Sequence, residues 1–487
     1  MPVNALASGT DMIRFLPEII LTIAGTLLMV LDPVINKRAS SMFGHLSIVA
    51  LLAGIGASVY AYQHPGPAFG GMLVVDGFAT FFRILVMIVG ILTVLPSYRF
   101  LERQGGETGE FHALLLFSIA GQCIMASANE LIVIFIGLEI SSIASYVLAG
   151  YFRDDKRANE AALKYFLLGS FATAFFLYGV ALIYGMTGTI NLSAVRGVVM
   201  GQDPPSAVAI GVAAALMFVG LAFKISASPF QIWAPDVYQG APTPVSAFLS
   251  AGPKAAAFAI FLRIFMTAFE PISSGWMPLV WGASLLSMTV GNFAALLQTN
   301  IKRMLAYSSI AHAGYVLVAL TAQSDVGTAA AMFYLAGYAF MNVGAFAVVA
   351  HLSGRNEKYQ SIDDFKGLAV KQPLTAAMLT IFLLSLIGVP LTGGFFGKFY
   401  IFRAALQSHL YWLTVLGLLN SAVAAYYYLR ILVMMYMHEP GEAVADAEPL
   451  TPSMRLALIL PALGTLFLGI FPNWVLDFAG RSSLFVK

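Results

Sequence analysis

Residues 221–254 read LAFKISASPFQIWAPDVYQGAPTPVSAFLSAGPK and interrupt an otherwise apolar chain. An apolar helix is predicted to arrive with Lys224 in its final turns. The run SPF at 228–230 should then break it, because proline lacks an N–H and clashes with the preceding turn. A second apolar helix is predicted to begin near Val245 and to carry Lys254 near its middle. The stretch therefore predicts a broken helix with a lysine on each side of the break.

The composition places this break inside a membrane. Of 487 residues, 59% are hydrophobic and 10% are charged, whereas soluble domains average about 25% charged residues. The mean hydropathy is +0.83, and apolar runs of about 20 residues recur, which is typical of an all-α polytopic membrane protein. Nothing in the sequence suggests nucleic-acid binding. The N-terminus lacks the pattern of a cleaved signal peptide, so we expect the first helix to direct insertion.

The apolar runs predict about fourteen membrane spans. Loops rich in Lys and Arg alternate with loops poor in them, and the positive-inside rule makes the rich set cytoplasmic. With an even number of spans, both termini then face the side opposite the cytoplasm. The basic residues of the cytoplasmic set are Lys37, Arg38, Arg99, Arg103, Arg153, Lys156, Arg157, Lys302, Arg303, Arg355, Lys358, Lys366 and Lys371. The expected spans are 13–31, 43–61, 77–97, 111–127, 130–151, 160–186, 207–229, 244–268, 277–297, 303–322, 326–351, 374–408 (broken), 411–436 and 454–478.

A second break is predicted at residues 386–399, LIGVPLTGGFFGKF. Pro390 is expected to end an apolar helix, Gly393 and Gly394 to free the backbone, and the next half-helix to carry Lys398. A lysine at membrane depth costs about 2.5–3.5 kcal/mol, so it normally faces protein or water and marks an ion path. Broken helices persist at that depth only where the freed backbone is buried in protein or lines a wet cavity. Lysines at helix breaks therefore indicate ion transport.

The chain also contains a short internal echo. Residues 141–148 read SSIASYVL and residues 308–317 read SSIAHAGYVL, a separation close to that between Pro229 and Pro390. Two five-helix units explain both spacings, and units with an odd number of helices sit inverted relative to each other. We therefore divide the chain into N-terminal helices (1–110), two inverted five-helix repeats (111–270 and 271–436) and a C-terminal loop and helix (437–487).

Five ionisable side chains are predicted to form a proton relay inside the membrane: Glu139, Lys224, Lys254, His312 and Lys398. A carboxylate changes the proton affinity of a buried lysine nearby, so charge movement at Glu139 can switch Lys224 between holding and releasing a proton. Histidine can carry a proton near neutral pH. The alternative is structural: a static Glu–Lys pair that locks helices together, and a histidine in a helix–helix hydrogen bond.

Other polar residues are expected to be mainly structural. Asp76 and Arg83 lie seven residues apart, on one helical face, and are predicted to pair. Lys164 follows Glu160 by four residues, which predicts a local helix pair at least as well as a relay role. The remaining assignments are arginines extending toward an interface (Arg263, Arg430), a turn aspartate (Asp236) and packing tyrosines (Tyr426, Tyr427, Tyr428).

The chain lacks motifs for redox cofactors. It contains no GxGxxG, Walker loop, CxxC cluster or His-x-x-His pair, and the single cysteine, Cys123, cannot build an iron–sulfur or zinc cluster. We therefore expect no bound cofactor and no metal. If the chain serves a redox enzyme, the redox chemistry occurs in other chains.

Three motifs resemble one family. They are KISASPFQIWAPDVYQGAPTPVSAFLSAGPKAA (224–256), NIKRMLAYSSIAHAGYVLVAL (300–320) and SLIGVPLTGGFFGKFYIF (385–402). The first is similar to the signature of the antiporter-like subunits of proton-pumping NADH:quinone oxidoreductase, respiratory complex I, a family related to Mrp-type Na⁺/H⁺ antiporters. The other two look most like subunit N. Sister subunit L is longer, with a lateral helix after its core, and subunit M usually has a glutamate where this chain has Lys398.

The resemblance implies fourteen spans, inverted repeats, and breaks in helices 7 and 12. It implies that Glu139 is the carboxylate of span 5, Lys224 its partner on span 7, and Lys254 the central relay lysine. It further implies that His312 lies on the axis between half-channels and Lys398 near the far-side exit. Quinone reduction elsewhere in the complex would then drive protons through this subunit, whose partners are other membrane-arm subunits and the lipid bilayer.

Two alternatives to this function remain open. A subunit of an Mrp-type cation/proton antiporter shares the fold, and sodium-dependent proton flux without NADH dehydrogenase activity would identify it. A non-pumping scaffold subunit would use its charges only in assembly. Charge-neutralising substitutions in a scaffold would damage assembly and pumping in proportion.

Overall fold

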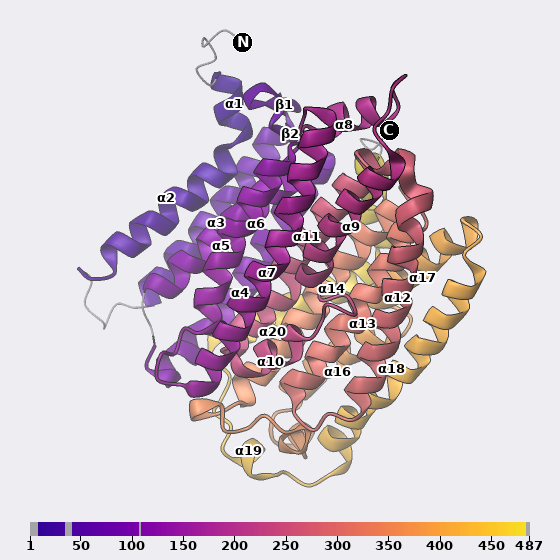
Figure 1. Ribbon diagram of the computed structural model, residues 1–487. Coiled ribbons are helices and arrows are strands. Elements are labelled where there is room, and N and C mark those ends of the chain that lie inside the picture. Colours follow the sequence, from indigo (N-terminus) through magenta and orange to yellow (C-terminus); the bar gives the residue numbers. More distant parts are fainter. Residues whose placement is uncertain (1–7, 35–40, 107–108, 484–487) are drawn as a thin grey trace.

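The computed structural model describes residues 8–34, 41–106 and 109–483 and shows a bundle of long helices (Figure 1). Within these residues, twelve helices are long and apolar enough to cross a membrane, and two shorter apolar helices, α2 (Leu16–Leu31) and α16 (Pro373–Ile387), bring the number to fourteen. Each occupies one of the predicted spans. The twelve are α3 (Ser41–Tyr62), α4 (Gly77–Gln104), α5 (Gly109–Ser127), α6 (Leu131–Ala149), α7 (Lys156–Thr187), α9 (Ala207–Lys224), α11 (Thr243–Thr267), α12 (Ser273–Leu296), α13 (Ile301–Thr321), α14 (Asp325–Leu352), α18 (Tyr411–Met437) and α20 (Pro452–Ile470).

Short elements cover the two ends of the bundle. The antiparallel hairpin β1–β2, α1 and α8 lie at one end, and α19 lies at the other (Figure 1). The short elements are α1 (Gly9–Arg14), β1 (Gly66–Ala68), η2 (Phe69–Gly71), β2 (Leu73–Val75), α8 (Leu192–Val199), α10 (Trp233–Gly240), η3 (Glu270–Ile272), η4 (Arg355–Glu357), η5 (Ile362–Phe365), α15 (Leu368–Lys371), α19 (Glu442–Ala445) and α21 (Pro472–Ser482). Helix α17 (Gly393–Gln407) is the second half of the broken span that begins with α16, and it packs on α14.

Loops rich in Lys and Arg meet at the α19 end of the bundle. There the Arg103 guanidinium, at the end of α4, donates hydrogen bonds to the carbonyls of Ala350 and His351 at the end of α14. The predicted basic residues Lys37 and Arg38 lie outside the described residues. Loops that are distant in sequence but alike in charge therefore share one end, as the alternation of basic loops predicts.

Two five-helix units pack in the same pattern. In the first, α5 packs on α6 and α7 on α9; in the second, α12 packs on α13, and α14 on both α16 and α17. The echoed sequence falls on corresponding helices, α6 and α13. The first unit begins at the α19 end, whereas the turn before α12 contacts α8 at the opposite end, through Arg196 and Glu270 at 2.9 Å. The predicted fold class is confirmed, and the residue boundaries of the units stay a prediction.

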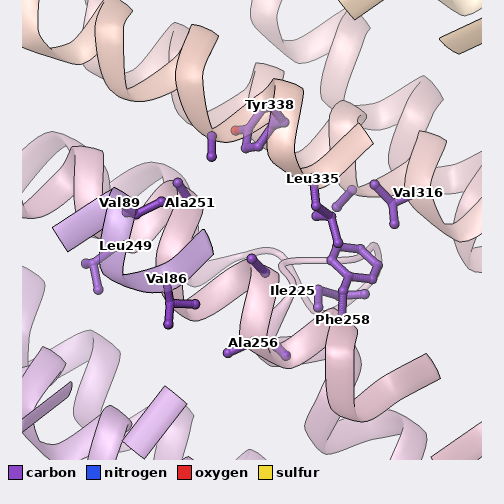
Figure 2. Close-up of a cluster of buried hydrophobic side chains, with 14 of the residues drawn as sticks. Val86, Val89, Ile225, Leu249, Ala251, Ala256, Phe258, Val316, Leu335 and Tyr338 are labelled. Carbon is purple, nitrogen blue, oxygen red and sulfur yellow. The ribbon is translucent and has the colours of Figure 1, made fainter. Parts of the chain in front are cut away.

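Helix α11 forms the centre of the bundle. It packs against α4, α5 and α14, and all its residues from Thr243 to Met266 are buried. Lys254, in the middle of this helix, therefore faces protein and not lipid. Figure 2 shows apolar side chains of α11 lying among those of neighbouring elements, namely Val86 and Val89 of α4, Ile225 of the first break, Val316 of α13, and Leu335 and Tyr338 of α14.

The first break begins before the predicted proline. Helix α9 ends at Lys224, and α10 begins only at Trp233. The Ala227 N–H donates to the Ala222 carbonyl at 2.8 Å, a hydrogen bond that closes helix ends. The predicted end of this span at Pro229 was therefore too late. A closing turn ends the helix, and the proline lies beyond it.

The second break begins at Gly388, two residues before the Pro390 that was predicted to end the helix, and Gly393 and Gly394 do not form its turn as predicted. Helix α16 ends at Ile387, and Gly388 follows with a left-handed φ of 96°, as glycines at helix C-termini commonly do. Gly393 and Gly394 are the first residues of α17. A Cβ on Gly394 would lie 1.8 Å from the Ser385 carbonyl oxygen. This glycine therefore allows the two half-helices to pack closely.

The predicted pair of Asp76 and Arg83 is wrong. Arg83 instead pairs with Glu18 of α2 at 2.7 Å, and both side chains are buried. Asp76 pairs with Arg263 at 3.1 Å, so Arg263 is buried and does not extend toward an interface. Asp76 caps the start of α4 and Arg83 lies about two turns later, but their partners come from helices that are distant in sequence.

Replacing Gly394 with alanine is expected to destabilise the second broken helix, because the added methyl group collides with the Ser385 carbonyl. Overpacking of a filled site costs roughly 1–3 kcal/mol. We therefore expect a lower thermal midpoint. The midpoint is the temperature at which half of the detergent-solubilised chain is lost from its monodisperse gel-filtration peak. Gly211→Ala is the matched control, because nothing lies within 4 Å of a Cβ there. Equal midpoints for the two variants would contradict this packing.

Candidate functional site

Lys224 lies at the end of α9, beside the first break. Its ammonium donates hydrogen bonds to the Ser142 hydroxyl of α6 at 2.7 Å and to the Tyr165 hydroxyl of α7 at 3.3 Å. The Tyr146 ring lies 5.8 Å from the same nitrogen. The lysine is only 4% exposed, and a buried ammonium needs such partners because it has lost its water. The end of α9 therefore places a lysine in a polar pocket between three helices.

Glu139 lies one helical turn before Ser142, so both side chains project from the same face of α6. Its carboxylate is near enough to interact electrostatically with Lys224. No direct ion pair joins the two among the described residues; the ammonium bonds to Ser142 and Tyr165 instead. Oxygen Oε1 of Glu139 is buried and has no hydrogen-bond partner within the described part of the chain. A static Glu–Lys lock is therefore not formed.

Lys254 contacts the second unit from the middle of α11. Its ammonium donates to the hydroxyl oxygen of Ser309 at 2.5 Å and to the carbonyl oxygen of the same residue at 3.1 Å. Tyr238 of α10 donates its hydroxyl proton to the Leu249 carbonyl of α11 at 3.3 Å. Ser142 and Ser309 are the second serines of the two echoed motifs, so each unit offers the same serine to a lysine. The echo contained the signal for these serines, which sequence reasoning did not use.

His312 lies one turn after Ser309 on α13. Its Nδ1 is 2.6 Å from the Tyr334 hydroxyl and its Nε2 is 3.2 Å from the Tyr428 hydroxyl. The Tyr428 hydroxyl also bonds to Ser308. Sequence reasoning assigned Tyr428 to packing and did not identify Tyr334. A buried tyrosine hydroxyl requires a partner, but the sequence does not say which one.

Lys398 extends from α17 back to the end of α16. Its ammonium donates to the carbonyls of Leu386 and Ile387 at 3.0 and 2.8 Å, and to the Ser421 hydroxyl of α18 at 2.8 Å. These carbonyls have no partner within their own helix, and a cation at a helix C-terminus is also favoured by the helix dipole. The face of the Tyr315 ring lies 4.9 Å from the ammonium. The second break therefore creates the binding site for its own lysine.

Helix α13 connects the central lysine to the second break. Ser309, His312 and Tyr315 follow at three-residue spacing, and the rings of His312 and Tyr315 are 5.7 Å apart. Toward the first break, the Tyr238 hydroxyl donates to the Leu249 carbonyl of α11 at 3.3 Å, and the Trp233 ring lies between the rings of Tyr238 and Tyr165, at 6.0 and 4.5 Å. The structure thus brings the predicted residues into one buried row, in the order Glu139, Lys224, Lys254, His312 and Lys398.

Another polar cluster lies at the α19 end of the bundle. Lys164 pairs with Glu160 at 2.7 Å, which confirms the predicted helix pair, and also with Asp236 at 2.8 Å. Asp236 in turn pairs with Arg303 at 2.6 Å. Asp236 therefore joins α7, α10 and α13, a wider role than the predicted turn chemistry.

The described residues hold no group of three or more His, Cys, Asp or Glu side chains arranged to bind a metal ion. The buried row consists of amines, hydroxyls, one carboxylate and one imidazole. Such groups exchange protons but not electrons. The expectation that the chain binds no cofactor stays a prediction.

The comparisons with known proteins identify the family. The family model described as "NADH:quinone oxidoreductase/Mrp antiporter, TM" matches residues 128–424. The chain is 77% identical over 487 residues to NADH-quinone oxidoreductase subunit N 1 of Solibacter usitatus, with 100% of both chains covered. It is similar to a chain of respiratory complex I from Thermus thermophilus, with a TM-score of 0.81 and 35% identity over 95% of this chain and 99% of that chain. A chain of the Mrp complex from Dietzia shares the fold, with a TM-score of 0.84 at 21% identity over 97% of each chain.

These similarities extend over nearly the whole chain and agree with the three motifs that resemble this family. They also agree with the observed plan of fourteen apolar helices and two breaks. The chain therefore belongs to the NADH-quinone oxidoreductase subunit N family, the antiporter-like membrane subunits of respiratory complex I.

Proposed function

We propose that this chain translocates protons across the membrane as a membrane-arm subunit of respiratory complex I. The observation that carries the proposal is the buried row from Glu139 to Lys398, in which two of the three lysines lie at helix breaks. Ionisable groups at this depth are expensive and mark ion pathways. Here each of the three lysines has hydrogen-bond partners, yet within the described part of the chain none has a carboxylate in direct contact. Each ammonium is therefore free to respond to a charge that moves nearby.

The proposed path begins at the α19 end. Water and protons enter on this side near Lys224 and Lys254, pass His312, and leave by way of Lys398. Glu139 acts as the moving counter-charge of Lys224: approach of negative charge favours the ammonium, and its withdrawal favours proton release. His312 suits transfer between the lysines because one ring nitrogen donates while the other accepts.

The energy for this transport is proposed to come from other chains. NADH oxidation and quinone reduction take place elsewhere in the complex, and this chain binds no flavin, iron–sulfur centre, metal or quinone. Its partners are neighbouring antiporter-like membrane-arm subunits and the lipid bilayer. The chain thus contributes to an enzyme, a translocating oxidoreductase, without redox chemistry of its own.

Two other functions predict different behaviour. An Mrp-type cation/proton antiporter shares this fold, but its proton flux depends on sodium and needs no NADH. A scaffold subunit uses its buried charges only in assembly. The absence of a direct Glu139–Lys224 ion pair among the described residues favours the proton relay over the scaffold, because a charge used only in assembly is normally satisfied by its partner.

Removing the charge of Glu139 or of Lys224 tests this function. Glu139→Gln and Lys224→Ala are expected to lower NADH-driven proton pumping in proteoliposomes by roughly tenfold or more, since a positioned proton-transfer group contributes about 10²–10⁴ in rate. The complex should still assemble with its flavin and iron–sulfur centres, and pumping by the unaltered complex should not require sodium. Lys358→Ala is the control, because that lysine is exposed and paired with Glu442. Normal pumping by an assembled Glu139→Gln complex would falsify the relay, and a strict sodium requirement would indicate an antiporter.

The orientation follows from the basic loops gathered at the α19 end. We propose that this end is cytoplasmic and that both termini are periplasmic, in a bacterial cell membrane. A cysteine at Asp203, beyond α8, should react with a membrane-impermeant maleimide in intact spheroplasts. A cysteine at Asp154 should react only in inverted vesicles. Both positions are exposed, and the native Cys123 is buried. The reverse labelling pattern would overturn the orientation.

A further inference from the structure

We propose that Glu357 and Lys302 form the gate through which protons reach Lys254 from the α19 end of the bundle. This inference rests on the proton-translocating function proposed above and adds the intake side of the path. Neither residue belongs to the buried row described so far. Both are buried, and they pair with each other at 3.0 Å.

A large cavity opens next to this pair. It has a volume of about 960 Å³, and Gly240, Pro242 and Glu357 form part of its wall. A water molecule occupies about 30 Å³ in the liquid and needs polar partners, so a cavity of this size and lining holds water. The Glu357 side chain therefore lies at the boundary between the water-filled cavity and the protein interior. Among the described residues, the other charged side chains of the wall are Glu110, Arg153, Asp154, Asp155, Lys156 and Arg157.

Lys302 lies behind the cavity wall. Its side chain is fully buried, and its ammonium donates to the Ala241 carbonyl at 2.6 Å as well as to Glu357. Ala241 stands between the wall residues Gly240 and Pro242. The ion pair therefore spans the wall, with the carboxylate toward water and the ammonium toward the interior.

The backbone at Glu357 is strained, and hydrogen bonds hold its carboxylate in place. Its φ is 49° and that of Asn356 is 55°, left-handed conformations that cost on the order of 1–3 kcal/mol in non-glycine residues and cluster at functional sites. The carboxylate also accepts hydrogen bonds from the backbone N–H and the hydroxyl of Thr243, the first residue of α11. The same carboxylate thus contacts water, Lys302 and the helix that carries Lys254.

Two elements lead from the gate to the central lysine. Lys302 and Ser309 are seven residues apart, so they lie on one face of α13, roughly 10 Å apart along the axis. Ser309 accepts the hydrogen bond of Lys254. Tyr238 of α10, three residues before Ala241, donates its hydroxyl proton to the Leu249 carbonyl of α11 at 3.3 Å. One face of α13 therefore leads from Lys302 to Ser309, the hydrogen-bond acceptor of Lys254.

One proton crosses the gate in two balanced steps. Lys302 passes an ammonium proton along this face of α13, by way of the Ser309 hydroxyl, to the neutral amine of Lys254. Glu357 takes a proton from cavity water and transfers it to the neutral Lys302 amine, which restores the ion pair. The net change is one proton lost from the cavity and one gained by Lys254.

The test uses the purified, assembled complex carrying Glu357→Gln. The amide keeps the size of the side chain and an oxygen acceptor for Thr243, but it cannot take up a proton. We expect NADH:quinone turnover and proton pumping to fall by about tenfold or more with unchanged assembly and thermal midpoint. Added formate should restore much of the turnover, because formic acid can carry protons past the blocked gate. Glu442→Gln, at an exposed ion-paired acid of the same end, should be fully active and unaffected by formate.

Lys254→Met, measured alongside, separates failure of this inference from failure of the proposed function. If Lys254→Met stops pumping and Glu357→Gln pumps normally, the gate is wrong and the relay stands. If both pump normally, the proposed function falls as well. A slow Glu357→Gln complex that formate does not restore, or one with a lowered thermal midpoint, would assign Glu357 to capping α11 and overturn the gate. Loss in both variants, with formate restoring only Glu357→Gln, supports it.

Discussion

A buried ammonium group must find hydrogen-bond acceptors, and this constraint explains most of the architecture. A regular helix offers none, because its carbonyls already bond to N–H groups four residues later. A broken helix exposes carbonyls at its end, and Lys398 binds two of them, on Leu386 and Ile387. Lys224 and Lys254 instead use the serine hydroxyls of the echoed motifs. Breaks and serines thus let lysines stay inside an apolar bundle without a permanent carboxylate partner.

The same constraint explains the central helices. Helix α11 is buried on all sides, so Lys254 is surrounded only by protein groups. Helix α13 supplies polar ones at three-residue spacing: Ser309, His312 and Tyr315. The tyrosine rings beside this row exclude lipid, and their hydroxyls supply polar contacts. At the α19 end, Glu357 and Lys302 connect the same helices to a charged cavity. Structure and proposed transport therefore depend on the same set of buried polar contacts.

Much of the fold follows from the sequence because the bilayer simplifies the problem. Apolar runs of about 20 residues must be helices in a bilayer, so the positions of the spans could be predicted. The basic loops assign alternating directions to these helices. Prolines and glycines within the apolar runs indicated the two breaks. The lysines and Glu139 stood out because charge is rare in such segments. The exact ends of helices could not be predicted: Gly388 and the turn after Lys224 make the breaks, not the nearby Gly394 and Pro229. Contacts between distant helices were also out of reach, which is why Arg83 was assigned the wrong partner and the hydroxyls of Tyr334 and Tyr428 were missed.

The most direct test of the account is proton pumping by the assembled complex carrying Tyr428→Phe. This change removes one hydroxyl, which bonds to both Ser308 and His312, and keeps the ring that packs in the core. Tyr426→Phe is the matched control, because Tyr426 lies two residues earlier on the same helix and is 65% exposed. The account predicts that Tyr428→Phe lowers NADH-driven pumping severalfold with normal assembly, while Tyr426→Phe pumps normally. Equal, unimpaired pumping by both variants would contradict the claim that protons pass along this row.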